Sequence, residues 1–261
     1  MSLRRLWLRA LPKALLSRAT GALTHLPLPR PLRARVHGTF ARRYGVDLGD
    51  VPAPLAEYPS LAAFFSRALG PGARPIAAAP LAWPCDGRIV TAGPLAGDQV
   101  PQVKGVDYPL RDLLQNEGLA AALVGGSQAT IYLAPGDYHR VHVPFDGELV
   151  AVRRVPGSLY PVNPPAVRCV RGLFALNARV VFELQIDDGR AGAVVMVAAL
   201  NVGDIAVTAP PPRILRRGDE LGRFGFGSTV VALVAPGGPR FAAAPAEMRV
   251  RMGGDASALP P

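Results

Sequence analysis

The chain has 261 residues, of which 49% are hydrophobic and 18% are charged, and its mean hydropathy is +0.22. It is long enough to bury a substantial core, yet no apolar stretch approaches the roughly 20 residues of a membrane-spanning helix. Cys85 and Cys169 provide neither a disulfide framework nor metal-ligand spacing, which indicates a reducing compartment. Glycine and proline, 28 residues each, favour turns and short strands over long helices.

The net charge of +10 comes from the N-terminus. Residues 1–45 hold ten basic residues and no acidic one, which leaves 19 basic and 19 acidic residues in the rest of the chain. Leucine, alanine and tryptophan recur at helical spacing in residues 3–11, with arginines on the other side. Pro12 ends or kinks this helix, and residues 13–23 form another. Such cationic amphipathic helices suit the surface of an anionic bilayer, so we expect residues 1–50 to contact a membrane.

Other functions for this basic segment are less well supported. A signal peptide needs an uninterrupted apolar core, and Arg9, Pro12 and Lys13 interrupt the candidate. A nucleic-acid-binding patch would use the same charge, but no recognition motif accompanies it. A solvated helix whose apolar stripe packs on the body of the protein remains the alternative.

The rest of the chain, residues 51–261, reads mainly as β-structure. A helix is predicted at 58–69, with Ser60 as its N-cap and Leu61, Phe64, Phe65 and Leu69 on one face, and another around 110–114. Strand-like runs occur at 88–92, 129–133, 142–153, 178–186, 193–200 and 228–234.

Two segments of this body echo each other. Pro84-Cys-Asp-Gly-Arg-Ile-Val90 and Pro144-Phe-Asp-Gly-Glu-Leu-Val150 share the pattern Pro-x-Asp-Gly-x-aliphatic-Val, and residues 217–224 resemble the glycine turn of biotinyl-type hybrid barrels. We therefore expect an α+β fold that is mainly β, with a duplicated, hybrid-barrel-like core preceded by N-terminal amphipathic helices. A biotin or lipoyl carrier is disfavoured, because no lysine lies in the tight turn that would present the cofactor.

Four residues of the body could carry chemistry. His139 and His142 lie in a strand-like segment, where His-x-x-His spacing puts the two rings on opposite faces, and no third ligand is obvious, so a metal site is disfavoured. Asp86 lies in an Asp-Gly pair, which is usually a turn, and Asp146 is equivalent by composition. Ser228 follows a glycine at the start of an apolar strand. Each of these residues, taken alone, also fits a purely structural role.

Taken together, seven motifs in order resemble the bacterial phosphatidylserine decarboxylases along almost the whole chain. They are Tyr58-Pro-Ser-Leu-Ala-Ala-Phe-Phe-Ser-Arg67, Pro84-Cys-Asp-Gly87, Lys104-Gly105, Asp137-Tyr-His-Arg-Val-His142, Leu173-Phe-Ala-Leu-Asn177, Val202-Gly203 and Leu221-Gly-Arg-Phe-Gly-Phe-Gly-Ser-Thr-Val230. Three flanking positions depart from the usual pattern: Phe226, Ala178 and Asp204.

The resemblance implies roles for the four residues. Asp86, His142 and Ser228 would form the triad that drives self-cleavage between Gly227 and Ser228, and His139 would take part in decarboxylation. Ser228 would become a covalently bound pyruvoyl group that forms a Schiff base with the substrate amine, so neither PLP nor a metal is required. The products would be a β chain, residues 1–227, and an α chain, residues 228–261.

The resemblance also implies partners and a location. The catalytic domain, residues 51–261, would decarboxylate phosphatidylserine in an anionic membrane, at the cytoplasmic face of the inner membrane, without binding nucleic acid. The two cleavage products would remain together as a heterodimer, and a homo-oligomer is compatible with this. Two other functions stay open: a pyruvoyl decarboxylase of a soluble amino acid, and a non-catalytic membrane-binding β protein whose candidate triad only makes turns.

Overall fold

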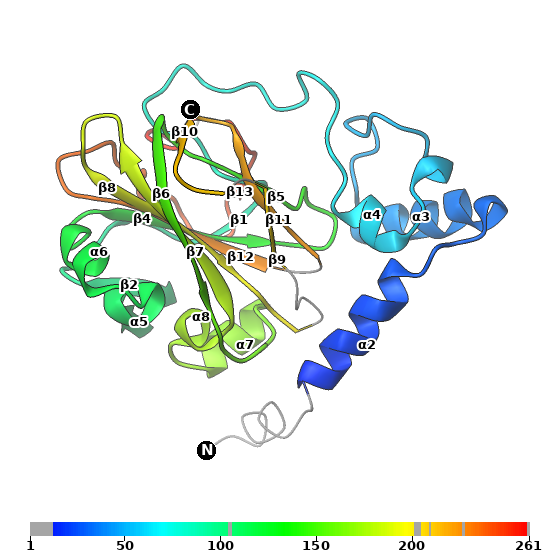
Figure 1. Cartoon of the computed structure of the whole chain (residues 1–261), viewed down its shortest axis with the longest axis horizontal. Coiled ribbons are helices and arrows are strands. Elements are labelled where there is room, and N and C mark those ends of the chain that lie inside the picture. Colours follow the sequence, from blue (N-terminus) through cyan, green and yellow to red (C-terminus); the bar gives the residue numbers. More distant parts are fainter. Residues whose placement is uncertain (1–12, 104–105, 201–204, 209, 226–227, 260–261) are drawn as a thin grey trace.

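The centre of the protein is an antiparallel sheet, seen in the computed structural model that Figure 1 shows. The structure describes residues 13–103, 106–200, 205–208, 210–225 and 228–259. Within them the large sheet has eight strands in the order β10-β6-β7-β8-β12-β4-β1-β13. Their bounds are β1 Gly87–Pro94, β4 Ser127–Leu133, β6 Gly147–Val155, β7 Arg179–Ile186, β8 Ala191–Val197, β10 Arg213–Leu215, β12 Ser228–Val234 and β13 Arg249–Val250.

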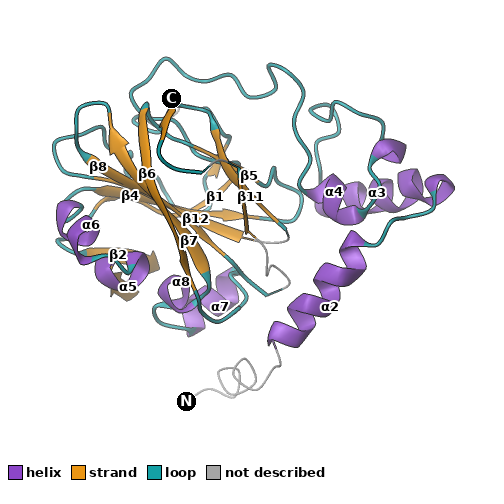
Figure 2. Ribbon diagram, in the orientation of Figure 1, coloured by secondary structure: helices purple, strands orange, loops and turns teal. Residues whose placement is uncertain are grey.

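Smaller elements cover both faces of this sheet (Figure 2). A three-stranded sheet in the order β5-β11-β9 packs on one face, and the β2–β3 hairpin with four short helices packs on the other. The bounds are β5 Arg140–His142, β9 Ile205–Val207, β11 Glu220–Phe224, β2 Gln99–Val103, β3 Val106–Pro109, α5 Leu110–Leu114, α6 Glu117–Ala122, α7 Pro164–Cys169 and α8 Leu173–Leu176.

The position of β12 in the sheet explains why its last five residues, 230–234, are apolar without interruption. All seven residues are buried, because the strand pairs with β8 on one side and β4 on the other and is covered on both faces. Val230, Ala232 and Val234 belong to the core under the small sheet, whereas Val231 and Leu233 belong to the core under the helices. A strand covered on both faces reads as a continuous hydrophobic run rather than an alternating one.

The sequence echo corresponds to a structural duplication. Gly87 begins β1 and pairs with Val250 of β13, and Gly147 begins β6 and pairs with Leu215 of β10. Both long strands also contain a register shift two residues after the glycine, at Ile89/Thr91 in β1 and at Leu149/Ala151 in β6.

The core has two halves, one containing β1 and the other β6. The residues just before these two strands form equivalent backbone hydrogen bonds with each other. The Ala82 amide donates to the Pro144 carbonyl, and the His142 amide donates to the Pro84 carbonyl, both at 2.8 Å. The two Asp-Gly segments are therefore adjacent, and these two hydrogen bonds are equivalent when the two copies are exchanged. The predicted duplicated, mainly β core is confirmed.

A helical layer stands beside the sheet and precedes it in the chain (Figure 1). It contains α2 Lys13–His25, α3 Arg30–Tyr44, the 3-10 turn η1 Leu55–Glu57 and α4 Leu61–Phe65. Helix α3 has a proline in its first turn and ends at Gly45, whose φ of 69° suits glycine. The buried His37 ring stacks on Phe64 at 5.1 Å, so α3 and α4 share a small core of their own.

Several predicted elements have different bounds in the structure. The Ser60 cap is confirmed, since its hydroxyl accepts the Ala63 amide at 3.2 Å, but the helix ends at Phe65 rather than continuing to Leu69. The single strand predicted at 142–153 is wrong, because a turn at 144–146 separates β5 from β6 and carries the chain from the small sheet to the large one. The helix predicted at 3–11 lies outside the described residues. No helix in the described ranges is long and apolar enough to cross a membrane.

Candidate active site

Ser228 lies at the beginning of β12, in the middle of the large sheet. It pairs with Leu133 of β4 and is completely buried. Its Oγ has no hydrogen-bond partner among the described residues. Leaving a buried hydroxyl unpaired costs on the order of 1–3 kcal/mol, so such a group needs an explanation beyond packing. Gly227, on the other side of the predicted cleavage bond, lies outside the described residues.

His139 is the second buried group without a complete set of partners. Its ring is fully buried against Phe65, with 3.9 Å between ring centroids, and its Nδ1 lies 2.9 Å from the Asp137 carbonyl oxygen. Because a carbonyl only accepts hydrogen bonds, Nδ1 carries the proton and Nε2 holds a lone pair. Nε2 has no partner in the described part of the chain. Burial lowers the pKa of His139 to about 3, so the ring is neutral at neutral pH.

His142 closes β5 and has both ring nitrogens occupied. Nδ1 donates to the Gly218 carbonyl oxygen at 2.7 Å, which leaves Nε2 to accept from the Tyr138 hydroxyl at 3.1 Å. Burial is the largest cause that lowers the pKa of His142, and the Glu220 and Asp86 carboxylates oppose it. Burial also raises the pKa of Tyr138 to about 12, so this phenol stays protonated and can donate.

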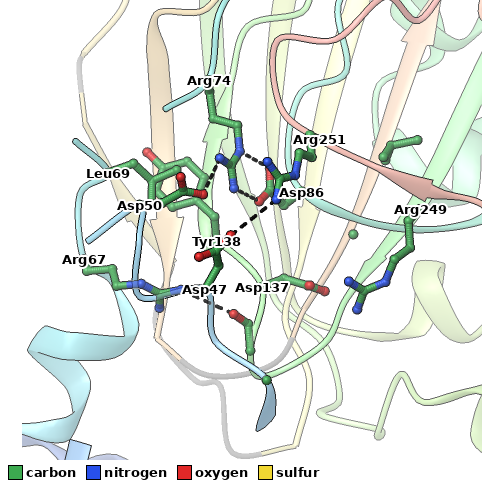
Figure 3. A pocket seen from close by; sticks show the side chains of 14 residues that line it. Asp47, Asp50, Arg67, Leu69, Arg74, Asp86, Asp137, Tyr138, Arg249 and Arg251 are labelled. Atoms are coloured by element: carbon green, nitrogen blue, oxygen red, sulfur yellow. Dashed lines mark hydrogen bonds and ion pairs between the residues drawn. The ribbon is translucent and has the colours of Figure 1, made fainter. Parts of the chain in front are cut away.

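Asp86 is held by an arginine rather than by a histidine (Figure 3). Arg74 reaches both carboxylate oxygens, with Nε to Oδ1 at 2.9 Å and Nη2 to Oδ2 at 2.6 Å. The same guanidinium binds Asp50 at 2.7 Å, and the Met252 amide donates to Asp86 Oδ1 at 2.9 Å. These paired charges raise the pKa of Arg74, and this bidentate geometry is the strongest type of side-chain ion pair.

The fold gathers these residues at one end of β4 and β12, although none of the four side chains is hydrogen-bonded directly to another within the described ranges. Ser228 lies opposite Leu133, the last residue of β4. The segment that holds both histidines follows directly after Leu133 in the chain. The His139 carbonyl accepts the Phe224 amide at 3.0 Å, and the backbone bond from His142 to Pro84 brings in the Asp86 turn. The four candidate residues thus come from three separate segments of the chain.

The described residues contain no group of three His, Cys, Asp or Glu side chains placed to hold a metal ion. Cys85 is completely buried, and burial raises the pKa of its thiol well above the usual range. It is therefore a protonated core residue rather than a reactive thiolate.

Comparison with known sequences agrees with these motifs. The sequence model described as phosphatidylserine decarboxylase matches residues 61–257, a range that includes all four candidate residues. The chain is 45% identical to the phosphatidylserine decarboxylase proenzyme of Anaeromyxobacter sp. (strain K), with 94% of each chain covered. It is 41% identical to that of Acidovorax ebreus, with 88% of each covered, and 40% identical to that of Xanthomonas euvesicatoria, with 93% and 94% covered. The chain belongs to the phosphatidylserine decarboxylase family.

Membership of the phosphatidylserine decarboxylase family makes the protein an enzyme, a carboxy-lyase, and confirms the resemblance found in the motifs. The relatives are described as proenzymes, which agrees with a zymogen. Not every family motif lies at the site. Asn177, which ends the motif at 173–177, binds the carbonyls of Tyr160 and Ala198 and the Tyr160 amide, and therefore serves the fold. The motifs at 104–105 and 202–203 lie outside the described residues.

Sequence reasoning missed several residues that surround the site of this decarboxylase. Tyr138 lies within the quoted motif at 137–142, and its place in that motif was the signal that could have identified it. Arg74 lies in a glycine- and proline-rich loop that carries no pattern, so nothing in the sequence points to its pairing with Asp86. The Gly218 carbonyl is a backbone group, and backbone acceptors cannot be read from residue types.

Proposed function

We propose that this chain is the self-cleaving precursor of a pyruvoyl-dependent decarboxylase that converts phosphatidylserine to phosphatidylethanolamine and carbon dioxide. The observation that carries the proposal is the Ser228 hydroxyl, which is fully buried, unpartnered within the described ranges, and placed directly after the predicted cleavage bond. Ser228 is the first residue of a buried core strand. It pairs with Leu133 of β4, and the residues that follow it pair with both β4 and β8, which holds the nucleophile in place.

Self-cleavage would begin with attack of Ser228 Oγ on the carbonyl carbon of Gly227. The bond from that carbon to the Ser228 nitrogen breaks, so the peptide becomes an ester and an amine is released. Loss of the proton on Cα of residue 228 then expels the Gly227 carboxylate from Cβ and leaves dehydroalanine. Hydrolysis of this enamine replaces nitrogen by oxygen, and the products are ammonia and a ketone at position 228.

His142 is the proposed base for the first proton transfer. The Gly218 carbonyl fixes the tautomer that leaves Nε2 unprotonated, which is the form that a base needs. Asp86 would contribute its charge, which favours the protonated imidazole, while Arg74 keeps the carboxylate in place. The Tyr138 hydroxyl is hydrogen-bonded to Nε2 of His142. For His142 to accept the proton of Ser228, this hydroxyl would have to move away or relay the proton.

The surroundings of Ser228 fit the pyruvoyl group that would replace it. A ketone carries no charge and tolerates a completely buried position. The nearby histidine segment supplies a neutral imidazole at His139, whose Nε2 has no partner among the residues that the structure describes. The group would supply the electron sink that loss of carbon dioxide requires. His139 is the proposed partner in the decarboxylation step, where its lone pair can take up a proton and return it to the substrate carbon.

The helical layer supports a membrane-bound enzyme. Leu23, Leu26 and Leu32 are exposed on or beside α2 and α3, with exposed fractions of 69%, 57% and 49%. Exposed basic residues accompany them at Arg30, Arg35, Arg42 and Arg43. Exposed leucines beside arginines suit the interface of an anionic membrane, and we place the enzyme on the cytoplasmic face of the inner membrane.

Intact-mass analysis tests the proposed function. The purified wild-type chain should give two polypeptides, residues 1–227 and residues 228–261, and the second should react with a carbonyl-trapping reagent. A Ser228→Ala variant should remain a single uncleaved chain, whereas Ser228→Cys, which keeps a nucleophile of similar size, should still cleave. A wild-type protein that stays full-length, or a Ser228→Ala variant that cleaves, would refute the proposal. Turnover of phosphatidylserine in vesicles but not of free serine would exclude a decarboxylase of soluble amino acids.

A further inference from the structure

A pocket opens between the helical layer and the small sheet. It has a volume of about 440 Å³, and its lining includes His25 of α2, Arg67 after α4, Arg140 of β5, and Arg223 of β11. It also reaches Gly225, the last described residue before the segment that leads to Ser228. No aspartate or glutamate is among the described residues that line it. The pocket is therefore basic and lies beside the proposed reaction centre.

The three arginines of this pocket differ in how their charge is neutralised. Arg140 forms an ion pair with Glu220 at 2.8 Å, so its charge is largely compensated. Arg223 is exposed and can be solvated by water. Arg67 is only 4% exposed, and no carboxylate in the described ranges pairs with it.

The hydrogen bonds of Arg67 are long and incomplete. Its Nη1 and Nη2 donate to the carbonyls of Phe64 at 3.5 Å and Gly136 at 3.3 Å, and its Nε has no partner among the described residues. The guanidinium carbon also lies 5.3 Å from the centre of the Phe64 ring. Burial lowers the pKa of Arg67, which expresses the cost of an incompletely compensated buried cation.

Two other buried arginines show what complete compensation looks like in this protein. Arg74 is bound by two carboxylates. Arg179 has no carboxylate partner in the described part of the chain, but its three nitrogens donate to four backbone carbonyls at 2.5–2.9 Å, those of Leu113, Asp112, Ala175 and Asn177. Arg67 has neither arrangement, so its environment leaves room for an external anion.

We propose that Arg67 binds the phosphodiester of the substrate headgroup in this pocket. This inference rests on the proposed function, because it takes phosphatidylserine as the substrate. A planar guanidinium matches two oxygens of a phosphate, and the Nε that has no partner is one of the donors used in such a bidentate contact.

The phosphodiester is favoured over the serine carboxylate for a chemical reason. A cation on the carboxylate would stabilise the ground state and lose its partner as carbon dioxide leaves, so it would slow the reaction. A cation on the phosphate keeps the same interaction from substrate to product. It contributes to binding without opposing the chemical step.

Arg67 also borders the cavity of Figure 3, but that cavity is a poorer site for an anion. Its volume is about 300 Å³ and its lining contains four carboxylates, those of Asp47, Asp50, Asp86 and Asp137. An anion entering there would meet these negative charges close to Arg67. No carboxylate is among the described residues that line the pocket reaching Gly225.

The test uses Arg67→Gln in the full-length, self-cleaved enzyme with dihexanoyl-phosphatidylserine as substrate. Loss of a charge-assisted contact should raise KM by about 10- to 100-fold. The turnover number should stay within about threefold, because the contact is equal in ground and transition states. Arg153→Gln is the control: this arginine is half-exposed in an ion pair with Glu183 on the large sheet, and its KM should not change. An unchanged KM in Arg67→Gln would overturn the inference.

Binding to the uncleaved Ser228→Ala chain separates this inference from the proposed function. Dihexanoyl-phosphatidylethanolamine, which has the phosphodiester but no carboxylate, should bind more weakly when Arg67→Gln is added. An O-acyl serine, which has the carboxylate but no phosphate, should bind equally to both proteins. Equal weakening of both ligands would overturn the phosphate assignment. A wild-type chain that fails to cleave would refute the proposed function and leave this binding result to decide the role of Arg67.

A measurement on a chain that keeps Arg67 covers the case in which Arg67→Gln does not fold. The Nε–H NMR signal of Arg67 in the Ser228→Ala chain, assigned with Arg67→Lys, should shift on addition of dihexanoyl-phosphatidylethanolamine. A monoacylglycerol, which lacks phosphate, should leave it in place. A signal unaffected by the phospholipid at saturating concentration would overturn the inference.

Discussion

Asp86 and Asp146 occupy equivalent positions in the two halves of the core, yet among the described residues only Asp86 is held by an arginine side chain. Each carboxylate accepts one backbone amide, from Met252 in one half and from Arg217 in the other, at 2.9 and 2.8 Å. Arg74, which binds Asp86, comes from the loop that links the helical layer to β1 and has no counterpart in the second half. Both halves of the core therefore contain the same Asp-Gly segment, and the loop before β1 adds an arginine to the copy that contains Asp86.

The first prediction concerns this arginine. Arg74→Met should lower the free energy of unfolding by about 3–5 kcal/mol, because it leaves the carboxylates of Asp86 and Asp50 partly buried without a cation. Urea unfolding at pH 7, in the Ser228→Ala background so that one chain unfolds, measures the change. Arg251→Met is the matched control. Its pair with Asp47 is exposed on both sides, and its loss should cost less than about 1 kcal/mol. Equal losses in the two variants would contradict the prediction.

A second prediction separates the two histidines. His142→Gln should slow self-cleavage by about 10²- to 10⁴-fold, the usual contribution of a general base. His139→Gln should still cleave but lose decarboxylation, since its proposed role begins after cleavage. Gel analysis over time and carbon dioxide release from short-chain phosphatidylserine give the two rates. Rapid cleavage in His142→Gln would remove this residue from the mechanism and make His139 the next candidate base, since its Nε2 has no partner within the described ranges.

The third prediction follows from the pKa of His139, which burial lowers to about 3 from an ordinary value of 6.5. Between these pH values the unfolded chain binds a proton that the folded chain excludes, so stability falls as the pH falls. For one such group the slope is about 1.4 kcal/mol per pH unit. His142, whose pKa burial also lowers, acts in the same direction, and Asp137, whose pKa burial raises, opposes it at lower pH.

Comparison with a variant isolates the contribution of His139. In the Ser228→Ala background, the free energy of unfolding of His139→Gln should depend less steeply on pH between 5.0 and 6.5 than that of the parent. The difference in slope should approach the value for one group. Parallel curves would show that His139 is accessible to protons in the folded chain.

The fourth prediction concerns the membrane. Replacing the exposed Leu23 and Leu26 with glutamate removes apolar area and adds charge that anionic lipids repel, so sedimentation with anionic vesicles should fall by at least about tenfold. Ile214→Glu is the control, because this residue is 74% exposed on β10, away from the helical layer. Neutral vesicles should bind all variants weakly. Undiminished binding to anionic vesicles would leave residues 1–12 as the remaining candidate contact.

The sequence predicted those parts of the fold that depend on local pattern. The apolar run at 228–234 identifies a strand because both faces of β12 are covered, and the repeated Pro-x-Asp-Gly pattern identifies the duplication because each copy makes the same turn and strand. The three-residue strands β5, β9 and β10 were not resolved as elements, since a run of three residues has no measurable periodicity.

The sequence identified the residues of the candidate site but not the hydrogen bonds and ion pairs that they form. His139, His142, Asp86 and Ser228 were identified from motifs, and the fold gathers their segments at one end of β4 and β12. The partners of these residues were not predicted. Arg74 lies 12 residues before Asp86 in a loop without a pattern, and Gly218 lies 76 residues from His142 and contributes only a backbone carbonyl. Such pairings depend on tertiary structure, and residue type alone does not encode them.

The position of Ser228 at the head of β12 has a consequence for the matured protein. A cut before this residue would leave β12 locked between β4 and β8, and β13 attached to β1, although both strands would then belong to the shorter chain. The two products would share a single core and could part only by unfolding. Maturation would thus change the covalent chemistry of the site without releasing any piece of the enzyme, and a denaturation experiment on the cut protein should show one cooperative transition.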